Sequence, residues 1–170
     1  FTFTDNTLTA AGSAMPLQFS KTVTNSPLTI SGGAVGAFPD AIQFTSAVMA
    51  SAVRISDATV TASDTTASAV HFKAAVFDSP LTVSGATFMS VADAVLYDTT
   101  VVDSSATFTD TSIAVSGVGA AGVHMVGPVV NTDLAMASGT VTAAAADWVT
   151  IGNSDDDCDV TFSDMVLQHP

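Results

Sequence analysis

The segments LTISGGAV (Leu28–Val35) and LTVSGATF (Leu81–Phe88) follow one eight-residue pattern: apolar, any, apolar, Ser/Thr/Ala, Asp/Gly/Ser, any two, apolar. The pattern recurs along all 170 residues, and successive copies start 25 to 28 residues apart. Within each copy apolar residues recur with a period of two, which is the period of a β-strand, and β-branched and aromatic residues are frequent. The seven copies start at Phe1, Leu28, Val53, Leu81, Ala106, Leu134 and Val160.

A second pattern, apolar–any–apolar, lies between the copies, as in Val70–Phe72. Six residues after the start of each second pattern stands a valine, except in the last repeat, where this position is Asp155. Length varies only in the connector before this second pattern, from six to nine residues. A fixed frame with one variable corner is what stacked coils require. The sequence therefore predicts an all-β fold, a right-handed parallel β-helix in a single domain over residues 1–170. It would have about six coils of about 26 residues, each with three short strands.

The recurring apolar positions predict six inward-facing columns, the most aromatic of which contains Phe19, Phe44, Phe72 and Tyr97. Like residues stacked on like residues fill a narrow interior at native packing density. We therefore interpret the phenylalanines and valines as core residues and not as parts of a cofactor site.

The composition excludes several classes of protein. Lys and Arg total 3 against 16 Asp and Glu, so the net charge is −13, and nucleic-acid binding is not expected. No apolar run approaches the ~18 residues of a membrane span. Hydrophobic residues make up 48% and charged residues 11%, which is the opposite of a disordered acidic tail. The single cysteine excludes an internal disulfide framework.

The periodic pattern, especially LTISGGAV, LTVSGATF and ATFTDTSI (Ala106–Ile113) with the strands that follow, resembles right-handed β-helix surface proteins. These include autotransporter-passenger-like, pectate-lyase-like and large adhesin-type chains. The resemblance covers essentially the whole chain and concerns architecture, so it implies the fold and a surface location but no particular activity. Cleavage of acidic sugars is not expected, because Arg54, Lys21 and Lys73 lie in different columns and form no cationic cluster.

Two columns predict turns. In the first, Asp and Gly are expected to be interchangeable because both suit tight backbone geometry; paired carboxylates that hydrolyse a neutral glycan are the alternative. In the second, Ser and Thr hydroxyls are expected to bond to the backbone and between coils. The first column contains Asp5, Gly32, Asp57, Gly85, Asp110, Ser138 and Asp164, and the second contains Ser26, Ser51, Ser79, Ser104, Thr132 and Cys158.

His71 and His124 share an outward column two coils apart, about 10 Å, which is too far for one metal ion. We expect an exposed ladder there, whose Gln and His side chains could contact a glycan. The column contains Gln18, Gln43, His71, Leu96, His124 and Thr150.

The acidic segment NSDDDCD is the best metal candidate. Asn153, Asp155 and Asp157 place oxygen ligands at alternate positions, as in a calcium loop, with Asp164 at the twelfth position. Cys158 stands where such a loop has glycine. The alternative is solvated acidity at the end of the stack, and no other cofactor is expected.

An outward row of threonines resembles the arrays of β-solenoid ice-binding proteins, although Arg54 and Ala135 interrupt it. The alternative is that Thr and Ser simply suit exposed strands. The row contains Thr2, Thr29, Thr82, Thr107 and Thr161.

Neither end of the chain shows an obvious polar cap, and its start at Phe1 indicates a mature product or an excised segment. We expect a non-catalytic extracellular or cell-surface structural solenoid, either a subunit that assembles head to tail into filaments or a segment of an adhesin. A glycan-binding or glycan-cleaving β-helix enzyme is the second expectation and an ice-binding protein the third. The residues expected at the assembling ends are Phe1, Phe3, Leu8, Val160, Phe162 and Leu167.

Overall fold

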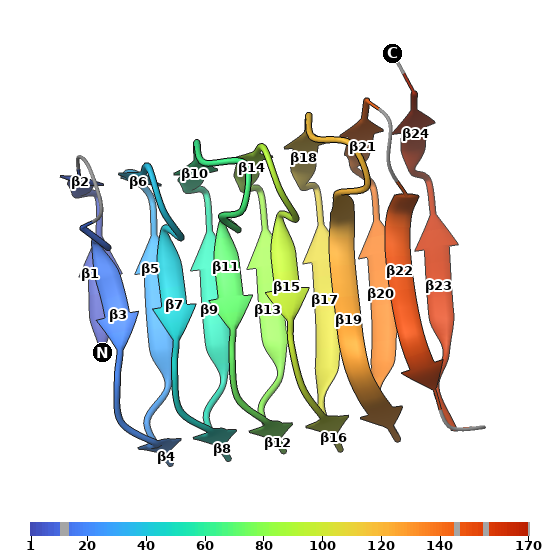
Figure 1. The fold of residues 1–170 in the computed structure, drawn as a ribbon, viewed down its shortest axis with the longest axis horizontal. Coiled ribbons are helices and arrows are strands. Elements are labelled where there is room, and N and C mark those ends of the chain that lie inside the picture. Colours follow the sequence, from blue (N-terminus) through green and yellow to red (C-terminus); the bar gives the residue numbers. More distant parts are fainter. Residues whose placement is uncertain (11–13, 145–146, 155–156, 170) are drawn as a thin grey trace.

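The computed structural model describes residues 1–10, 14–144, 147–154 and 157–169, and within these ranges the chain forms strands and turns but no helix. It winds into a β-solenoid of about six turns of roughly 26 residues. In Figure 1 the chain runs upward on the distant side and downward on the near side while it advances from left to right, which is a right-handed path. The predicted right-handed parallel β-helix is confirmed.

Sheet A is formed by the first half of each eight-residue pattern. Its register places Leu28 beside Val53 and Val53 beside Leu81, as the repeat predicts. All of its pairs are parallel, and they follow the order of the chain. The strands are β1 (Thr2–Thr4), β5 (Leu28–Ser31), β9 (Val53–Ser56), β13 (Leu81–Ser84), β17 (Ser105–Thr109), β20 (Asp133–Ala137) and β23 (Val160–Ser163).

Sheet B is formed by the second half of the same pattern. The fifth residue of every copy bends the chain from sheet A into sheet B, with φ between +49° at Asp5 and +66° at Gly32. Glycine and aspartate tolerate this left-handed conformation better than most residues, so the turn interpretation of this column is confirmed. The strands are β2 (Thr7–Ala10), β6 (Ala34–Ala37), β10 (Thr59–Ala62), β14 (Thr87–Ser90), β18 (Ser112–Val115), β21 (Thr140–Ala143) and β24 (Val166–Gln168).

Sheet C carries the second pattern and the valine that follows it. β19 runs through both parts without a break, so it joins a long and a short row of strands into one sheet. The long row contains β3 (Leu17–Phe19), β7 (Ile42–Phe44), β11 (Val70–Phe72), β15 (Val95–Tyr97), β19 (Ala121–Val130) and β22 (Asp147–Ser154). The short row contains β4 (Val23–Thr24), β8 (Val48–Met49), β12 (Val76–Phe77) and β16 (Val101–Val102).

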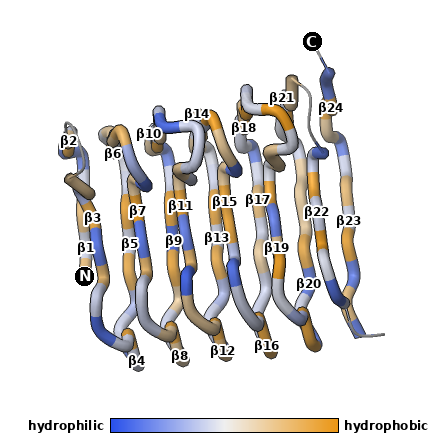
Figure 2. Tube along the Cα trace, in the orientation of Figure 1, coloured by the Kyte–Doolittle hydropathy of each residue, from blue (hydrophilic) through white to orange (hydrophobic). Residues whose placement is uncertain are grey.

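The core lies between the three sheets, and Figure 2 shows hydrophobic and hydrophilic residues alternating along the strands. Phe19, Phe44, Phe72 and Tyr97 stack face to face, with ring centroids 4.6 to 4.7 Å apart. This distance is close to the spacing of neighbouring strands, so one ring per coil fills the column. The predicted aromatic column is confirmed.

The serine column closes the turns before sheet A. The Ser51 hydroxyl donates to the Met49 carbonyl at 2.8 Å and accepts from the Ser26 amide at 2.9 Å. Ser79 and Ser104 repeat both contacts in the next coils, and Thr132 does so in the coil after them. The predicted turn-closing bonds are confirmed, and each also ties one coil to the next.

Candidate functional site

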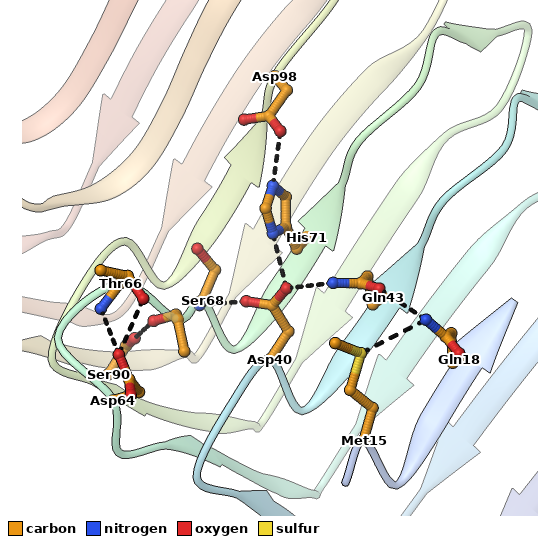
Figure 3. Close-up of polar contacts among 11 residues, drawn as sticks. Met15, Gln18, Asp40, Gln43, Asp64, Thr66, Ser68, His71, Ser90 and Asp98 are labelled. Atoms are coloured by element: carbon orange, nitrogen blue, oxygen red, sulfur yellow. Dashed lines mark hydrogen bonds and ion pairs between the residues drawn. The ribbon is translucent and has the colours of Figure 1, made fainter. Parts of the chain in front are cut away.

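A charged cluster lies where the variable connectors enter sheet C (Figure 3). Asp40 stands two residues before β7, His71 is in the middle of β11, and Asp98 follows β15 directly. The Nδ1 atom of His71 is 2.8 Å from Asp40 Oδ2, and its Nε2 atom is 2.9 Å from Asp98 Oδ2. One imidazole therefore joins carboxylates from the coils on either side of it.

Asp40 is the best-satisfied carboxylate of the cluster. Its Oδ1 atom accepts from the Ser68 amide at 2.7 Å, and its Oδ2 atom accepts from Gln43 Nε2 at 2.6 Å. Gln18 donates in turn to Gln43 Oε1 at 3.0 Å. Asp40 is only 5% exposed, so these bonds and the bond to His71 replace the water it loses.

The charges of the cluster favour one another. Burial lowers the pKa of His71, but hydrogen bonds to Asp40 and Asp98 and the charges of both carboxylates outweigh burial and raise this pKa above 6.5. Burial raises the pKa of Asp40, but the bond from His71, the Ser68 amide and the nearby imidazolium lower it below 3.8. Both shifts favour the charged forms of His71 and Asp40, and a second carboxylate, Asp98, lies on the far side of the ring.

A second aspartate–histidine pair repeats this geometry 53 residues further along the chain. His124 Nδ1 is 3.0 Å from Asp93 Oδ2, and Asp93 Oδ1 accepts from the Ala121 amide at 2.5 Å. Each aspartate thus holds a backbone amide 28 residues later and a histidine 31 residues later. We call Asp40–His71–Asp98 the first pair site and Asp93–His124 the second pair site.

The second pair site lacks two groups of the first. Leu96 takes the place of the glutamine that donates to Asp40, and Gly152, two residues after Thr150, takes the place of Asp98. Within the described residues, Nε2 of His124 has no hydrogen-bond partner. The sequence differences therefore fall in the coils before and after that of His124 and leave the Asp93–His124 pair itself intact.

A groove of about 300 Å³ lies beside the second pair site and is lined by Thr65, Val91–Asp93, Gly117–Ala120 and His124. Among the described residues its lining contains one carboxylate, Asp93, and this group is already bound to His124. Glycoside hydrolysis normally uses two carboxylates that face one space. The groove does not provide that arrangement, and the predicted glycan-cleaving activity stays a prediction.

The predicted exposed ladder on β7 and β11 is wrong. Gln43 is only 1% exposed and His71 only 7%. Asp40, in the connector before β7, hydrogen-bonds to both Gln43 and His71. It therefore shields these two side chains from solvent. Gln18 is exposed, whereas Leu96, His124 and Thr150 are partly buried.

A signal for both pair sites was present in the sequence. An aspartate stands two residues before the second pattern at positions 40, 93 and 147. A histidine stands inside the pattern at 71 and 124, 31 residues after the first two of these aspartates. Asp40 and Asp93 are 53 residues apart, and so are His71 and His124, because short and long connectors alternate. Each of these two aspartates therefore meets the histidine of the next coil, and the pair recurs after two coils and not after one. Asp98 directly follows its second pattern, and no other coil has an acidic residue at that position.

The predicted calcium site falls at the last coil. Asn153 lies in β22 and Asp157 in the turn after it, and both are exposed, whereas Asp155 lies outside the described residues. Asp164 occupies the turn between β23 and β24, with φ at +51°, like its counterparts in the earlier coils. In the part of the chain that the structure covers, no three His, Cys, Asp or Glu residues lie close enough to hold a metal ion together. The calcium site stays a prediction.

The threonine row lies on sheet A, where the register brings its members into one file. Thr2 pairs with Thr29 and Thr82 with Thr107. Arg54 separates the two pairs, and Ala135 separates the second pair from Thr161. No run of threonines in the file is longer than two among the described residues, so nothing in the register favours ice binding.

The predicted end residues are more exposed than their counterparts inside the stack. Phe1 is 62% exposed and Val160 43%, whereas Val53 in the same column is 2% exposed. Phe162 is 41% exposed, whereas Ile30 is fully buried. Phe3, Leu8 and Leu167 are partly buried.

No protein-family model, curated protein or solved structure matches this chain. Within the described residues, no helix is long and apolar enough to cross a membrane.

Proposed function

We propose that the chain is a non-catalytic structural β-solenoid of the extracellular space or the cell surface whose end faces are covered by further coils. The further coils belong either to another copy in a head-to-tail filament or to the rest of a surface adhesin. The observation that carries the proposal is that apolar columns, fully buried in the middle of the stack, remain open at both ends.

Each end face combines apolar side chains with free strand edges. Phe1 packs edge-on against Phe19, with ring centroids 6.0 Å apart. Both rings line a hollow of about 460 Å³, which Val23 and Leu28 also line. Val160 and Phe162 line a smaller hollow at the other end, of about 380 Å³. Unpaired edges of parallel strands accept another strand readily, and covering a half-exposed phenylalanine contributes about 1 kcal/mol.

The sides of the solenoid favour separation of neighbouring molecules. The net charge of −13 comes from 16 aspartates against three Lys and Arg, and several of these aspartates occupy turns, as at Asp57, Asp78 and Asp103. Like-charged sides repel at moderate ionic strength. Apolar ends and repelling sides together direct association along the solenoid axis, and a heterologous contact of this kind generates open filaments.

The two end faces differ in outline. Sheets A and B extend to β23 and β24, whereas the last described strand of sheet C is β22, one coil earlier. A second copy that places β1 on β23 leaves one strand position of sheet C unfilled, a gap of about 4.8 Å along the axis. In a filament, successive copies either leave this gap open or shift along the axis by one coil to close it. The axial repeat of the filament distinguishes these two arrangements.

The test is a concentration series followed by light scattering and negative-stain electron microscopy. We expect the mass to rise with concentration and rods to lengthen in steps of one solenoid. Phe162→Asp places a charge in the end face and should raise the concentration at half assembly tenfold or more. Val118→Asp is the matched control, because Val118 is 92% exposed but lies in the connector before β19.

A protein that stays monomeric up to its solubility limit would contradict the head-to-tail filament, because separate copies would then not cover one another's end faces. An equal effect of Val118→Asp and Phe162→Asp would show that association uses the general surface and not the ends. Circular dichroism of both variants shows whether the fold is retained.

A further inference from the structure

We propose that the first pair site is a pH-dependent clamp. A doubly protonated His71 ring ties coils 2, 3 and 4 together through Asp40 and Asp98, and loss of one ring proton releases Asp98. Coils are numbered here by the copies of the eight-residue pattern, so that Asp40 belongs to coil 2, His71 to coil 3 and Asp98 to coil 4.

The geometry requires two protons on the ring. An ionised carboxylate only accepts hydrogen bonds, and both ring nitrogens of His71 lie within 2.9 Å of a carboxylate oxygen. A neutral ring carries one N–H, so one nitrogen would direct its lone pair at a carboxylate. The close contacts on both sides therefore belong to the imidazolium form.

The surroundings leave few other charges to compete. Gln43 on β7 and Leu96 on β15 flank His71 in the sheet, and neither is titratable. In the described ranges, Asp40 and Asp98 are the titratable groups in contact with the ring. Asp64, in the connector of His71's own coil, bonds to Thr66, and Lys73, after β11, has an exposed side chain.

The two carboxylates respond differently when the ring loses a proton. Asp40 has a 7% exposed side chain and is fixed by the Ser68 amide and Gln43, so it keeps the remaining Nδ1–H. The side chain of Asp98 is 40% exposed and forms no other hydrogen bond among the described residues. It therefore turns into water, and the contact between coils 3 and 4 is lost while the contact between coils 2 and 3 remains.

The signs of the two titrations define a pH window. The folded-state pKa of His71 is raised, so its contribution to stability is complete below pH 6.5 and is lost as the pH rises through that raised pKa. The folded-state pKa of Asp40 is lowered, so its contribution is present above pH 3.8 and is lost as the pH falls through that lowered pKa. The clamp is strongest between these limits.

The experiment follows the histidine side chains by ¹H–¹⁵N NMR from pH 5 to 9 in the intact protein, with urea unfolding over the same range. We expect both nitrogens of His71 to be protonated at pH 7. Both the Asp98 carboxyl shift and the urea midpoint should change at the pH where the ring loses its proton. Asp98→Asn should lower the midpoint of the His71 titration by about one pH unit or more.

His71→Gln tests the stability effect. Glutamine already occupies the same column at Gln18 and Gln43, so the strand accommodates it. This variant should lose the fall in urea midpoint between pH 6.5 and 9, whereas the matched variant His124→Gln should retain it.

Three results would overturn the clamp: a neutral His71 ring at pH 7, an unchanged His71 titration in Asp98→Asn, or an unchanged pH profile in His71→Gln. Asp98→Asn changes a partly exposed side chain, so the NMR test stands even where His71→Gln folds poorly.

Discussion

The two pair sites have one backbone geometry and two different sets of neighbours. In both, an aspartate two residues before a sheet C strand receives a backbone amide and a histidine Nδ1 from the next coil. The side chain of His71 is 8% exposed and meets a second carboxylate, whereas that of His124 is 27% exposed and meets none among the described residues.

This difference shows what each part of the repeat controls. The Asp–His contact forms between neighbouring coils, and it recurs 53 residues later because short and long connectors alternate. The additional contacts of the first site come from Gln43 and Asp98, which have no equivalents in the second. In a solenoid, a repeated frame therefore supports a local site whose contacts are set by one or two side chains in the adjacent coils.

Removing the aspartate should separate the two sites most strongly. Asp40→Ala leaves a buried imidazolium with one partner and an unpaired Ser68 amide, and we expect it to lower the free energy of unfolding by about 3 kcal/mol. Asp93→Ala removes two bonds at a more open site and should cost about 1–2 kcal/mol. Urea unfolding at pH 6 measures both, and equal losses would mean that the second carboxylate and Gln43 do not distinguish the sites.

Rebuilding part of the first site at the second should have a smaller effect of opposite sign. Leu96→Gln offers Asp93 the amide donor that Gln43 offers Asp40, since Leu96 and Gln43 flank His71 in the same column. We expect a gain of about 0.5–1 kcal/mol in the free energy of unfolding. The double variant Leu96→Gln/Asp93→Ala is the control, because without the carboxylate the gain should disappear; a gain that persists would point to the strand and not to the pair.

A change on sheet A should have the smallest effect and sets the baseline for both comparisons. Thr82 is exposed on β13, away from either pair site, and Thr82→Leu should change the free energy of unfolding by no more than about 0.5 kcal/mol. The same variant tests the ice-binding expectation. Thermal hysteresis in the wild type that is lost in Thr82→Leu would support that function against the structural one proposed here.

The frame of the fold could be predicted from the sequence because each coil repeats it. Leu28, Val53 and Leu81 lie in register, and the Asp/Gly alternation at Asp5 and Gly32 marks a left-handed turn. Both signals are local and recur in every coil, so the repeat period alone is enough to predict the strand register and the turns.

The first pair site could not be predicted in full because its groups follow different rules. The outward position of His71 on its strand indicated exposure, but a connector residue from another coil, Asp40, covers it. Side-chain orientation follows from strand periodicity, whereas coverage depends on how a connector folds back. The position of Asp98 recurs in each coil, but no other coil has an acidic residue there, so no repeated signal marks its contact with the ring.

The aromatic column has a spectroscopic consequence. Tyr97 is the only tyrosine of the chain and ends the stack of rings in the middle of the solenoid, while the only tryptophan, Trp148, is partly buried in β22 near one end. Burial raises the pKa of the Tyr97 phenol far above its usual value of 10. Phenolate absorbance in alkali therefore reports the opening of the central coils, and indole fluorescence reports fraying of the last ones. The native chain thus carries two optical labels that separate melting from the tip and melting from the middle.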